Sequence, residues 1–190
     1  AMAYEIGAEL TNMEFMQIGM GFSWPVVNIF NGYIWEGKPS LKDKDGNDIF
    51  ENVLPEDLTK EDVMHEHRKH FPFSSSDSSQ YLEIAVQRAI RSGKGTDHGG
   101  VHIDLNCMTD EYVNSLKDDC GIHHMWPIAR DYMKTKGVDL LKDHNVEVAV
   151  YAHAVNGGIR IDENAMSSVE GLFAAGECAG GPHGADRLGG

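Results

Sequence analysis

Residues Val169–Gly190 read VEGLFAAGECAGGPHGADRLGG. The apolar run Leu172–Ala175 predicts a short buried strand, and it leads into a loop with six glycines between Gly176 and Gly190. Glycine leaves the backbone N–H groups accessible, so a glycine-rich loop after a buried strand is typical of places where α/β proteins hold the phosphates and ribose of a cofactor. A surface loop with tight turns explains the same composition. The segment is therefore the first candidate for a cofactor contact.

Two parts of this segment, Val169–Glu177 and His183–Gly190, resemble the FAD-contacting return strand of the succinate dehydrogenase and fumarate reductase flavoprotein family. Other segments resemble further parts of that family, in the same order along the chain. They are Gly7–Gln17 (the start of the capping domain), Asp43–Phe50 (a hairpin turn), Gly93–Gly95 and Gly99–Leu105 (a helix end and the next strand) and His153–Ile159 (an active-site segment). The resemblance covers nearly the whole chain and implies an FAD-dependent oxidoreductase.

The resemblance also implies roles for single residues. In this family the flavin exchanges a hydride with a substrate carbon next to a carboxylate, so fixed cations are needed where negative charge develops. His153 falls on the family's substrate-binding histidine, and Arg187 falls on the arginine that grips a substrate carboxylate. The cofactor-binding positions implied by the return segment are Gly176, Glu177, Arg187, Leu188 and Gly189. Without the resemblance, His153 would be interpreted as a loop residue and Arg187 as a surface charge.

Three positions depart from the family pattern. Gly19-Met20-Gly21 replaces a His-Pro-Thr segment, and no threonine-glutamate pair stands near Asn31-Gly32. The proton-delivering arginine falls at Ser79, whereas Arg88 and Arg91 lie two or three helical turns away. Groups that act together in one transition state are costly to lose, so fumarate is not the expected substrate. The substrate is expected to be a small molecule that is less charged or larger.

We expect two parts in the chain: a capping, or substrate, domain over residues 1–166, and the start of a return segment into a missing FAD-binding domain over residues 167–190. No Gly-x-Gly-x-x-Gly fingerprint follows a strand, since Gly19-Met20-Gly21 and Gly93-Lys94-Gly95 lack the third glycine. The expected partner is therefore the FAD-binding domain of the same polypeptide, and the chain alone is expected to be inactive and to carry no FAD. A further candidate partner is an electron-transfer subunit.

Charge and composition exclude several classes of protein. Thirty acidic residues against sixteen basic ones give a net charge of −14, which repels nucleic acid. No segment approaches the roughly 18 apolar residues that a membrane span needs. The three cysteines, Cys107, Cys120 and Cys178, form no Cys-x-x-Cys pair, so we expect neither a disulfide framework nor a structural metal site. We expect a cytoplasmic protein, peripheral to the membrane where it joins a complex.

The pattern of elements predicts an α+β fold with small sheet elements, several helices and no complete Rossmann domain. Capping residues and glycines predict helices over Lys60–His70 after Thr59, over Ser79–Ser92, after Thr109, and over Trp126–Lys136 with Pro127 at its start. Extended segments are expected at Met13–Ile18, Val26–Phe30, Tyr33–Trp35, Ile49–Phe50, Val146–Tyr151 and Gly158–Asp162. This arrangement agrees with the capping domain that the resemblance implies.

Two clusters invite a metal assignment that their spacing does not support. His65–His70 lacks the spacing of His-Glu-x-x-His, so it indicates a solvated helix face. The aspartates around Gly46 do not follow the EF-hand spacing, and a hairpin turn explains them. We therefore expect no metal site.

Two alternatives stay open for the function. One is another flavoprotein of the same group, of the ketosteroid dehydrogenase, aspartate oxidase or adenylylsulfate reductase type. The other is a non-catalytic binding or regulatory module on the same scaffold.

Overall fold

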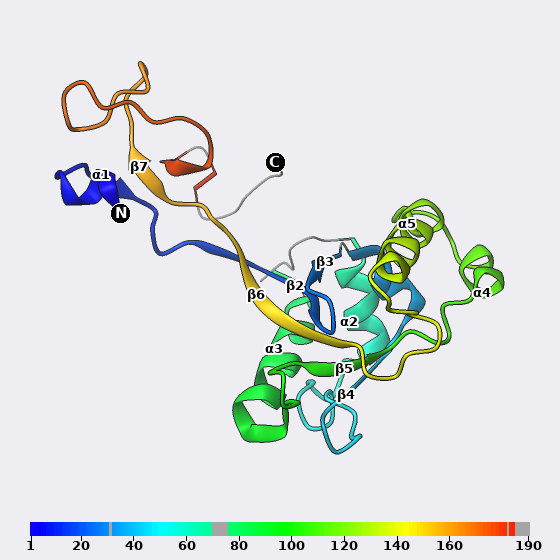
Figure 1. The fold of residues 1–190 in the computed structure, drawn as a ribbon. Coiled ribbons are helices and arrows are strands. Elements are labelled where there is room, and N and C mark those ends of the chain that lie inside the picture. The colour runs from blue at the N-terminus through cyan, green and yellow to red at the C-terminus, as the bar shows by residue number, and fades with distance from the viewer. Residues whose placement is uncertain (31, 70–75, 182, 185–190) are drawn as a thin grey trace. The chain divides into compact units, whose positions relative to one another are not determined.

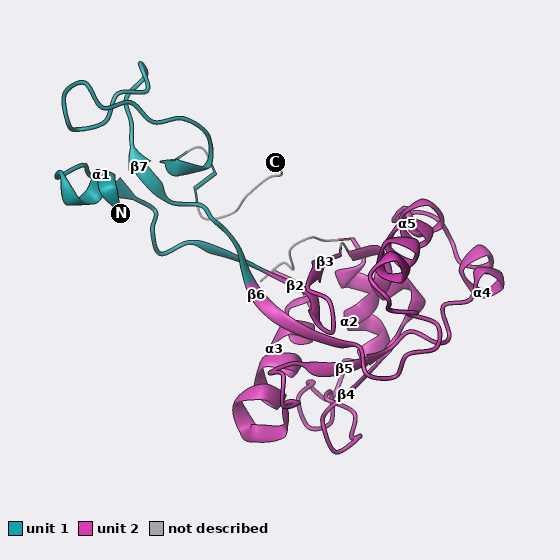
Figure 2. Cartoon of the chain, viewed as in Figure 1, with its two compact units in different colours: residues 1–18, 152–190 teal, residues 19–151 magenta. Residues whose placement is uncertain are grey.

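A computed structural model describes residues 1–30, 32–69, 76–181 and 183–184 of the chain. The contacts divide the chain into two compact units (Figure 2). Unit 1 combines residues 1–18 with residues 152–190, and unit 2 holds residues 19–151. The expected domain boundary after residue 166 concerns the intact protein and stays a prediction.

The larger sheet has five strands in the order β3-β2-β6-β5-β4 (Figure 1). In that order they are Asn28–Ile29, Met16–Trp24, Glu147–Val155, Val101–Asp104 and Ser40–Lys42. The β2–β3, β4–β5 and β5–β6 pairs are antiparallel. Burial alternates along β5, where Val101 and Ile103 are buried and His102 and Asp104 are half-exposed. One face of β5 therefore packs on the core, and the other presents polar side chains.

Helices supply most of the remaining structure of unit 2. They are the α-helices α2 (Lys60–His67), α3 (Gln80–Ala89), α4 (Asp110–Ser115) and α5 (Ile122–Thr135), with the 3-10 helix η1 (Gly32–Gly37) and a π-helical turn η2 (Ile90–Lys94) after α3. Helix α2 packs on α3 and η1, and α5 packs on η1 and α4. Thr59 and Asp62 form a reciprocal capping box at α2, and Thr109 caps α4, as predicted.

The hydrophobic core lies within unit 2. All clustered core residues fall between Met20 and Val148, and the largest fully buried side chains include Trp35 and Trp126. The face of α3 that the sequence predicted to be apolar is in this core, from Leu82 to Ala89. Among the described residues of unit 1, the only buried apolar side chains are alanines. They are Ala8, Ala154, Ala174 and Ala179.

Unit 1 is built on short strands and begins with one short helix, α1 (Met2–Glu5). Its three-stranded sheet has the order β1-β7-β8, formed by Leu10–Thr11, Gly158–Arg160 and Ala179–Gly180. β1 pairs antiparallel with β7, and β7 pairs parallel with β8. A Cβ at Gly158 would collide with the backbone of Cys178, and a Cβ at Gly180 would lie 2.5 Å from the nitrogen of Gly158. Glycine is therefore what lets β7 and β8 approach each other.

The predicted buried strand at Leu172–Ala175 is wrong. Phe173 makes one isolated bridge to Met166, and its side chain is 61% exposed. The segment continues into the 3-10 turn η3 (Gly176–Cys178) and then into β8. The run therefore lacks the neighbouring strands that would bury it in this chain.

Three other element predictions are corrected by the structure. Tyr33–Trp35 is buried in the 3-10 helix η1 and not in a strand, because apolar character alone does not separate the two. Ile49–Phe50 lies in a turn. Helix α5 begins at Ile122, so Pro127 lies inside the helix and not at its first position. The stop at Gly137 is confirmed, since Gly137 adopts φ 83° just beyond the helix.

Candidate functional site

The candidate substrate residue His153 lies in β6, not in a loop between two strands as predicted. Its ring nitrogen Nδ1 is 2.6 Å from Oε1 of Gln17, which lies in β2. Gln17 is 7% exposed, and both residues belong to unit 1. The two strands thus hold an imidazole and a buried amide in direct contact.

This contact fixes the tautomer of the ring. The amide oxygen of Gln17 accepts a hydrogen bond, so Nδ1 of His153 carries the hydrogen and donates it. The half-buried His153 is therefore held in one orientation by Gln17.

The segment after His153 is fixed by its glycines. The N–H of Asn156 donates to the carbonyl of Phe15 at 2.9 Å. A Cβ at Gly157 would collide with the backbone of Asn12 and Met13. Glycine at this position is therefore required by the close approach of two backbones within unit 1, whatever ligand is bound.

The candidate cofactor residues Gly176 and Glu177 lie in the turn η3. Gly176 has φ 74°, and a Cβ built there would meet nothing within 4 Å. Both residues are exposed, and Cys178 beside them donates from its thiol to the carbonyl of Ala175 at 3.1 Å. The turn is thus open on its outer side. The other candidates, Arg187, Leu188 and Gly189, lie outside the described residues.

The positions that depart from the family pattern have structural explanations of their own. Gly21 lies in β2, where a Cβ would be 2.7 Å from the carbonyl oxygen of Asn28 and 2.9 Å from the ring of Tyr151. Ser79 is completely buried before α3. Arg88 hydrogen-bonds to the carbonyl of Asn52 at 3.3 Å. Packing therefore occupies the positions that correspond to the family's His-Pro-Thr segment and to its proton-delivering arginine, and Asn31 lies outside the described residues.

Tyr151 is an acidic group close to His153 in sequence, but it stays protonated. Burial raises its pKa to about 12, and its hydroxyl donates to the carbonyl of Met20 at 3.2 Å. It is therefore a structural hydrogen-bond donor and not a base at neutral pH.

Glu36, Asp119 and Cys120 form a cluster with metal-ligand chemistry. The buried guanidinium of Arg68 pairs with both carboxylates, at 2.9 Å from Glu36. This cation already supplies the positive charge that a metal ion would bring, so we interpret the cluster as an ion-pair network.

The described residues provide suitable contacts for only part of an FAD molecule. The open space beside Gly176 and Gly181 lets a large group approach the backbone, and the exposed Glu177 carboxylate can accept a hydrogen bond from a hydroxyl. Both glycines have positive φ. The donor and acceptor set fits the edge of such a cofactor, and its remaining contacts must come from elsewhere.

The whole chain, residues 1–190, matches the family model described as an FAD binding domain. The chain belongs to this family. The prediction of a fumarate reductase and succinate dehydrogenase type of flavoprotein is thereby confirmed, and FAD is the cofactor of the family.

Individual relatives agree. The chain is 38% identical over 106 residues to a subunit of the CoM/CoB fumarate reductase of Methanothermobacter marburgensis, which is 56% of this chain and 18% of that protein. It is 31% identical over 189 residues to L-aspartate oxidase 2 of Ralstonia nicotianae, which is 99% of this chain and 30% of that protein. Among solved structures, Mycobacterium smegmatis Sdh1 in complex with UQ1 superposes with a TM-score of 0.66 at 29% identity, covering 98% of this chain and 28% of that one. The chain therefore spans less than a third of the length of each of these proteins.

Gln17 was missed as a site residue by the sequence analysis, although it ends one of the resembling segments. The available signal was a polar residue in the same inward-facing register as Gly19 and Gly21 along β2.

Among the described residues, no helix has the length and apolar character that a membrane crossing would take.

Proposed function

We propose that this chain is the substrate-capping portion of an FAD-dependent oxidoreductase, over residues 1–166, with a return segment into the FAD-binding domain from residue 167. The observation that carries the proposal is the pair formed by His153 and the buried Gln17 in a chain of this family. A buried amide that holds an imidazole in one orientation is expected where that orientation matters for function.

In this proposal FAD supplies hydride transfer to or from the substrate. In its imidazolium form, in which both ring nitrogens carry a hydrogen, His153 binds a substrate oxygen and stabilises the negative charge that develops there, while Gln17 holds the ring in place. Arg187, assigned by resemblance alone, binds a carboxylate of the substrate through its planar guanidinium. Gly176, Glu177, Leu188 and Gly189 contact the cofactor.

The proposed partner of unit 1 is the FAD-binding domain of the same polypeptide. Unit 1 exposes large apolar side chains, which isolated domains normally cover. They are Met2, Tyr4, Ile6, Leu10, Met13, Met16, Ile18 and Phe173. Since the only apolar side chains buried in the described part of this unit are alanines, we expect the chain alone to be inactive. A cytoplasmic location, peripheral to a membrane complex, belongs to the same proposal, as does an electron-transfer subunit.

The substrate in this proposal is not fumarate. Gly21 and Ser79 occupy packed positions where the family pattern would place ligands of a dicarboxylate and its proton donor. We expect a small molecule that is less charged or larger.

The test is His153→Ala in the full-length flavoprotein. We follow reduction of the flavin by a panel of donors and its reoxidation by a panel of acceptors, because the substrate takes part in one of these two steps. Loss of general acid–base or charge-stabilising groups costs about a hundredfold or more, and a drop of that order is expected. His124→Ala is the matched control, since His124 is exposed on α5 in unit 2. Equal rates of reduction and of reoxidation in both variants would remove His153 from the site.

The second candidate function is a non-catalytic module on the same scaffold. It is favoured by the packed positions of Gly21 and Ser79, which supply no group for catalysis. A full-length protein whose flavin neither accepts electrons from any reductant nor returns them to any acceptor would support this candidate over the enzyme.

A further inference from the structure

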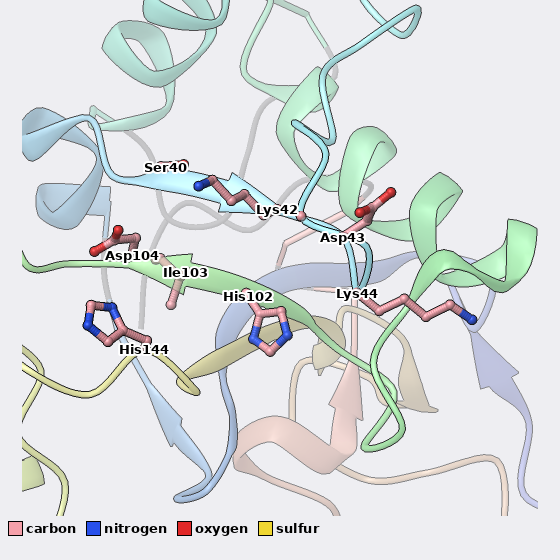
Figure 3. Close-up of a pocket in the computed structure, with 9 residues that line it drawn as sticks. Ser40, Lys42, Asp43, Lys44, His102, Ile103, Asp104 and His144 are labelled. Carbon is pink, nitrogen blue, oxygen red and sulfur yellow. The ribbon is translucent and has the colours of Figure 1, made fainter.

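A cavity of about 200 Å³ lies on the outer side of β4 and β5 in unit 2 (Figure 3). Its polar lining includes Ser40, Lys42, His102, Asp104 and His144. With liquid water at about 30 Å³ per molecule, the cavity has room for a small ion and a few waters. None of the roles proposed above involves these residues.

The strand register places these side chains together. Ser40 lies directly opposite Asp104, and Lys42 lies directly opposite His102. Directly opposite residues on antiparallel strands have Cβ atoms about 5 Å apart on the same face. Leu41 and Ile103, between them, point into the core. Backbone pairing therefore fixes the four residues from β4 and β5, and His144 joins them from the loop before β6.

Lys42 supplies a cation without a partner. Within the described part of the chain, its ammonium makes no ion pair within 4.0 Å and no hydrogen bond. Figure 3 shows this side chain extending along β4 toward Ser40, whereas that of Lys44 extends in the opposite direction. Of the two lysines on this hairpin, only Lys42 points toward the end of the cavity that holds Asp104 and His144.

Both histidines present Nε2 as a donor. Nδ1 of His102 is buried and has no hydrogen-bond partner among the described residues. A hydrogen on Nδ1 would therefore be a buried N–H group without an acceptor, which is costly, so the neutral tautomer carries its hydrogen on Nε2. Nδ1 of His144 is 2.8 Å from the side-chain nitrogen of Asn106 and accepts its N–H, which also leaves the hydrogen on Nε2. Two imidazole N–H donors therefore belong to residues that line one cavity.

Asp104 supplies an acceptor. Its Oδ1 accepts the N–H of Asn106 at 3.0 Å, and its other oxygen makes no hydrogen bond within the described residues. The neighbouring Asp43 is different, because its Oδ1 accepts N–H groups of Asp45 and Asn47 inside the hairpin turn. Burial alone would raise the pKa of Asp43, but hydrogen bonds from Asn47 and Asp45 outweigh it and lower that pKa. Asp43 thus serves the turn, and Asp104 is the carboxylate left for a ligand.

We propose that this cavity is a binding site for a hydrogen phosphate ion. Lys42, His102, His144 and Ser40 donate to the phosphate oxygens, and Asp104 accepts the hydrogen bond of the remaining P–O–H group. Inorganic phosphate keeps such a hydrogen at neutral pH, while sulfate has none, and a phosphomonoester, with its second pKa near 6, has largely lost its own. Asp104 would repel the latter two ions.

The proposal is tested by isothermal titration calorimetry of the full-length protein at neutral pH with inorganic phosphate, sulfate and methyl phosphate. We expect saturable phosphate binding in the millimolar range. Sulfate and methyl phosphate should bind at least about tenfold more weakly, because the loss of a hydrogen bond to a charged group typically costs about tenfold or more in affinity. Asp104→Asn should weaken phosphate binding and remove the discrimination against sulfate.

Two lysine variants provide the matched comparison. Lys42→Gln is expected to weaken phosphate binding about tenfold, and Lys44→Gln, which removes the same charge from the far side of the cavity, about twofold or less. Both side chains are exposed, so neither variant should unfold the protein, and circular dichroism checks this. Equal binding of phosphate and sulfate, equal effects of the two lysine variants, or no saturable phosphate binding would each overturn the proposal.

Discussion

The two units of this chain are stabilised in different ways. Unit 2 buries a continuous cluster of large apolar side chains between Met20 and Val148, whereas the described part of unit 1 buries alanines and joins its strands through glycines. In unit 2 the apolar periodicity of the sequence determines the structure. In unit 1 glycines, which lack side chains, allow the strands to approach each other, and this unit contains the residues proposed to contact the substrate and the cofactor.

The largest expected effect is on the core of unit 2. Trp126 is fully buried, and its Nε1–H donates to the carbonyl of Met108 at 3.0 Å. Trp126→Ala should lower the free energy of unfolding by about 3–5 kcal/mol, through the lost burial and the cavity it leaves. Phe173→Ala, which removes a ring that is 61% exposed in unit 1, should cost about 0.5 kcal/mol or less. Urea unfolding of the chain followed by circular dichroism measures both, and equal costs would contradict the contrast between the units.

The next largest effect on stability is expected in unit 1, from the addition of a single methyl group. Gly158→Ala adds one methyl group where the backbone of Cys178 leaves no room, and such overpacking costs about 1–3 kcal/mol. Hydrogen exchange at the paired residues Leu10 and Ile159 should become about tenfold faster or more. Exchange at Val101 and Val148, paired in unit 2, is the internal control and should not change. Uniform acceleration in both units would show that they unfold together.

The role of Gln17 gives the next effect. Gln17→Leu keeps the volume near that of the native side chain but removes the acceptor for Nδ1 of His153. We expect turnover of the full-length protein to fall by about tenfold to a hundredfold, as for other partners that orient a reactive histidine. The pH profile of turnover should also shift, which loss of packing alone would not cause. Gln17→Glu keeps the acceptor and should retain more activity than Gln17→Leu.

The smallest effect concerns the ion pair between Arg68 and Asp119 in unit 2. The hydrogen bond from the Arg68 guanidinium lowers the pKa of Asp119. A carboxyl whose pKa is lower in the folded state stabilises the fold above its unfolded pKa, and this contribution is lost as the pH falls through the folded pKa. Asp119→Asn should therefore reduce stability at neutral pH, with a difference from the native chain that shrinks below about pH 4. Urea midpoints at neutral and acid pH check this, and a constant difference would contradict it.

The sequence predicted the elements whose signals are local. Thr59 and Thr109 cap their helices, Gly137 follows the end of α5, and α3 buries the face read from its apolar spacing. These features depend on neighbours within one helical turn, so the sequence contains the information that determines them.

The errors fall where the outcome depends on distant partners. Leu172–Ala175 resembles a buried strand, yet a strand needs neighbours to pair with, and in this chain Phe173 makes one isolated bridge. His153 was expected in a loop because Asn156-Gly157-Gly158 follows it, whereas Gly157 allows a close approach to residues 12–13 and Gly158 a close approach to Cys178. The pair between Gln17 and His153 joins residues 136 positions apart, so sequence spacing could not reveal it.

The contact between Gly158 and Gly180 has a mechanical consequence. Gly158 stands five residues after His153 and Gly180 three residues after Glu177, and the parallel pairing of β7 and β8 ties the two segments together at this point. We therefore expect a displacement of the turn at Glu177 to shift the strand that follows the imidazole. In the proposed enzyme this backbone pairing would link the substrate side to the cofactor side.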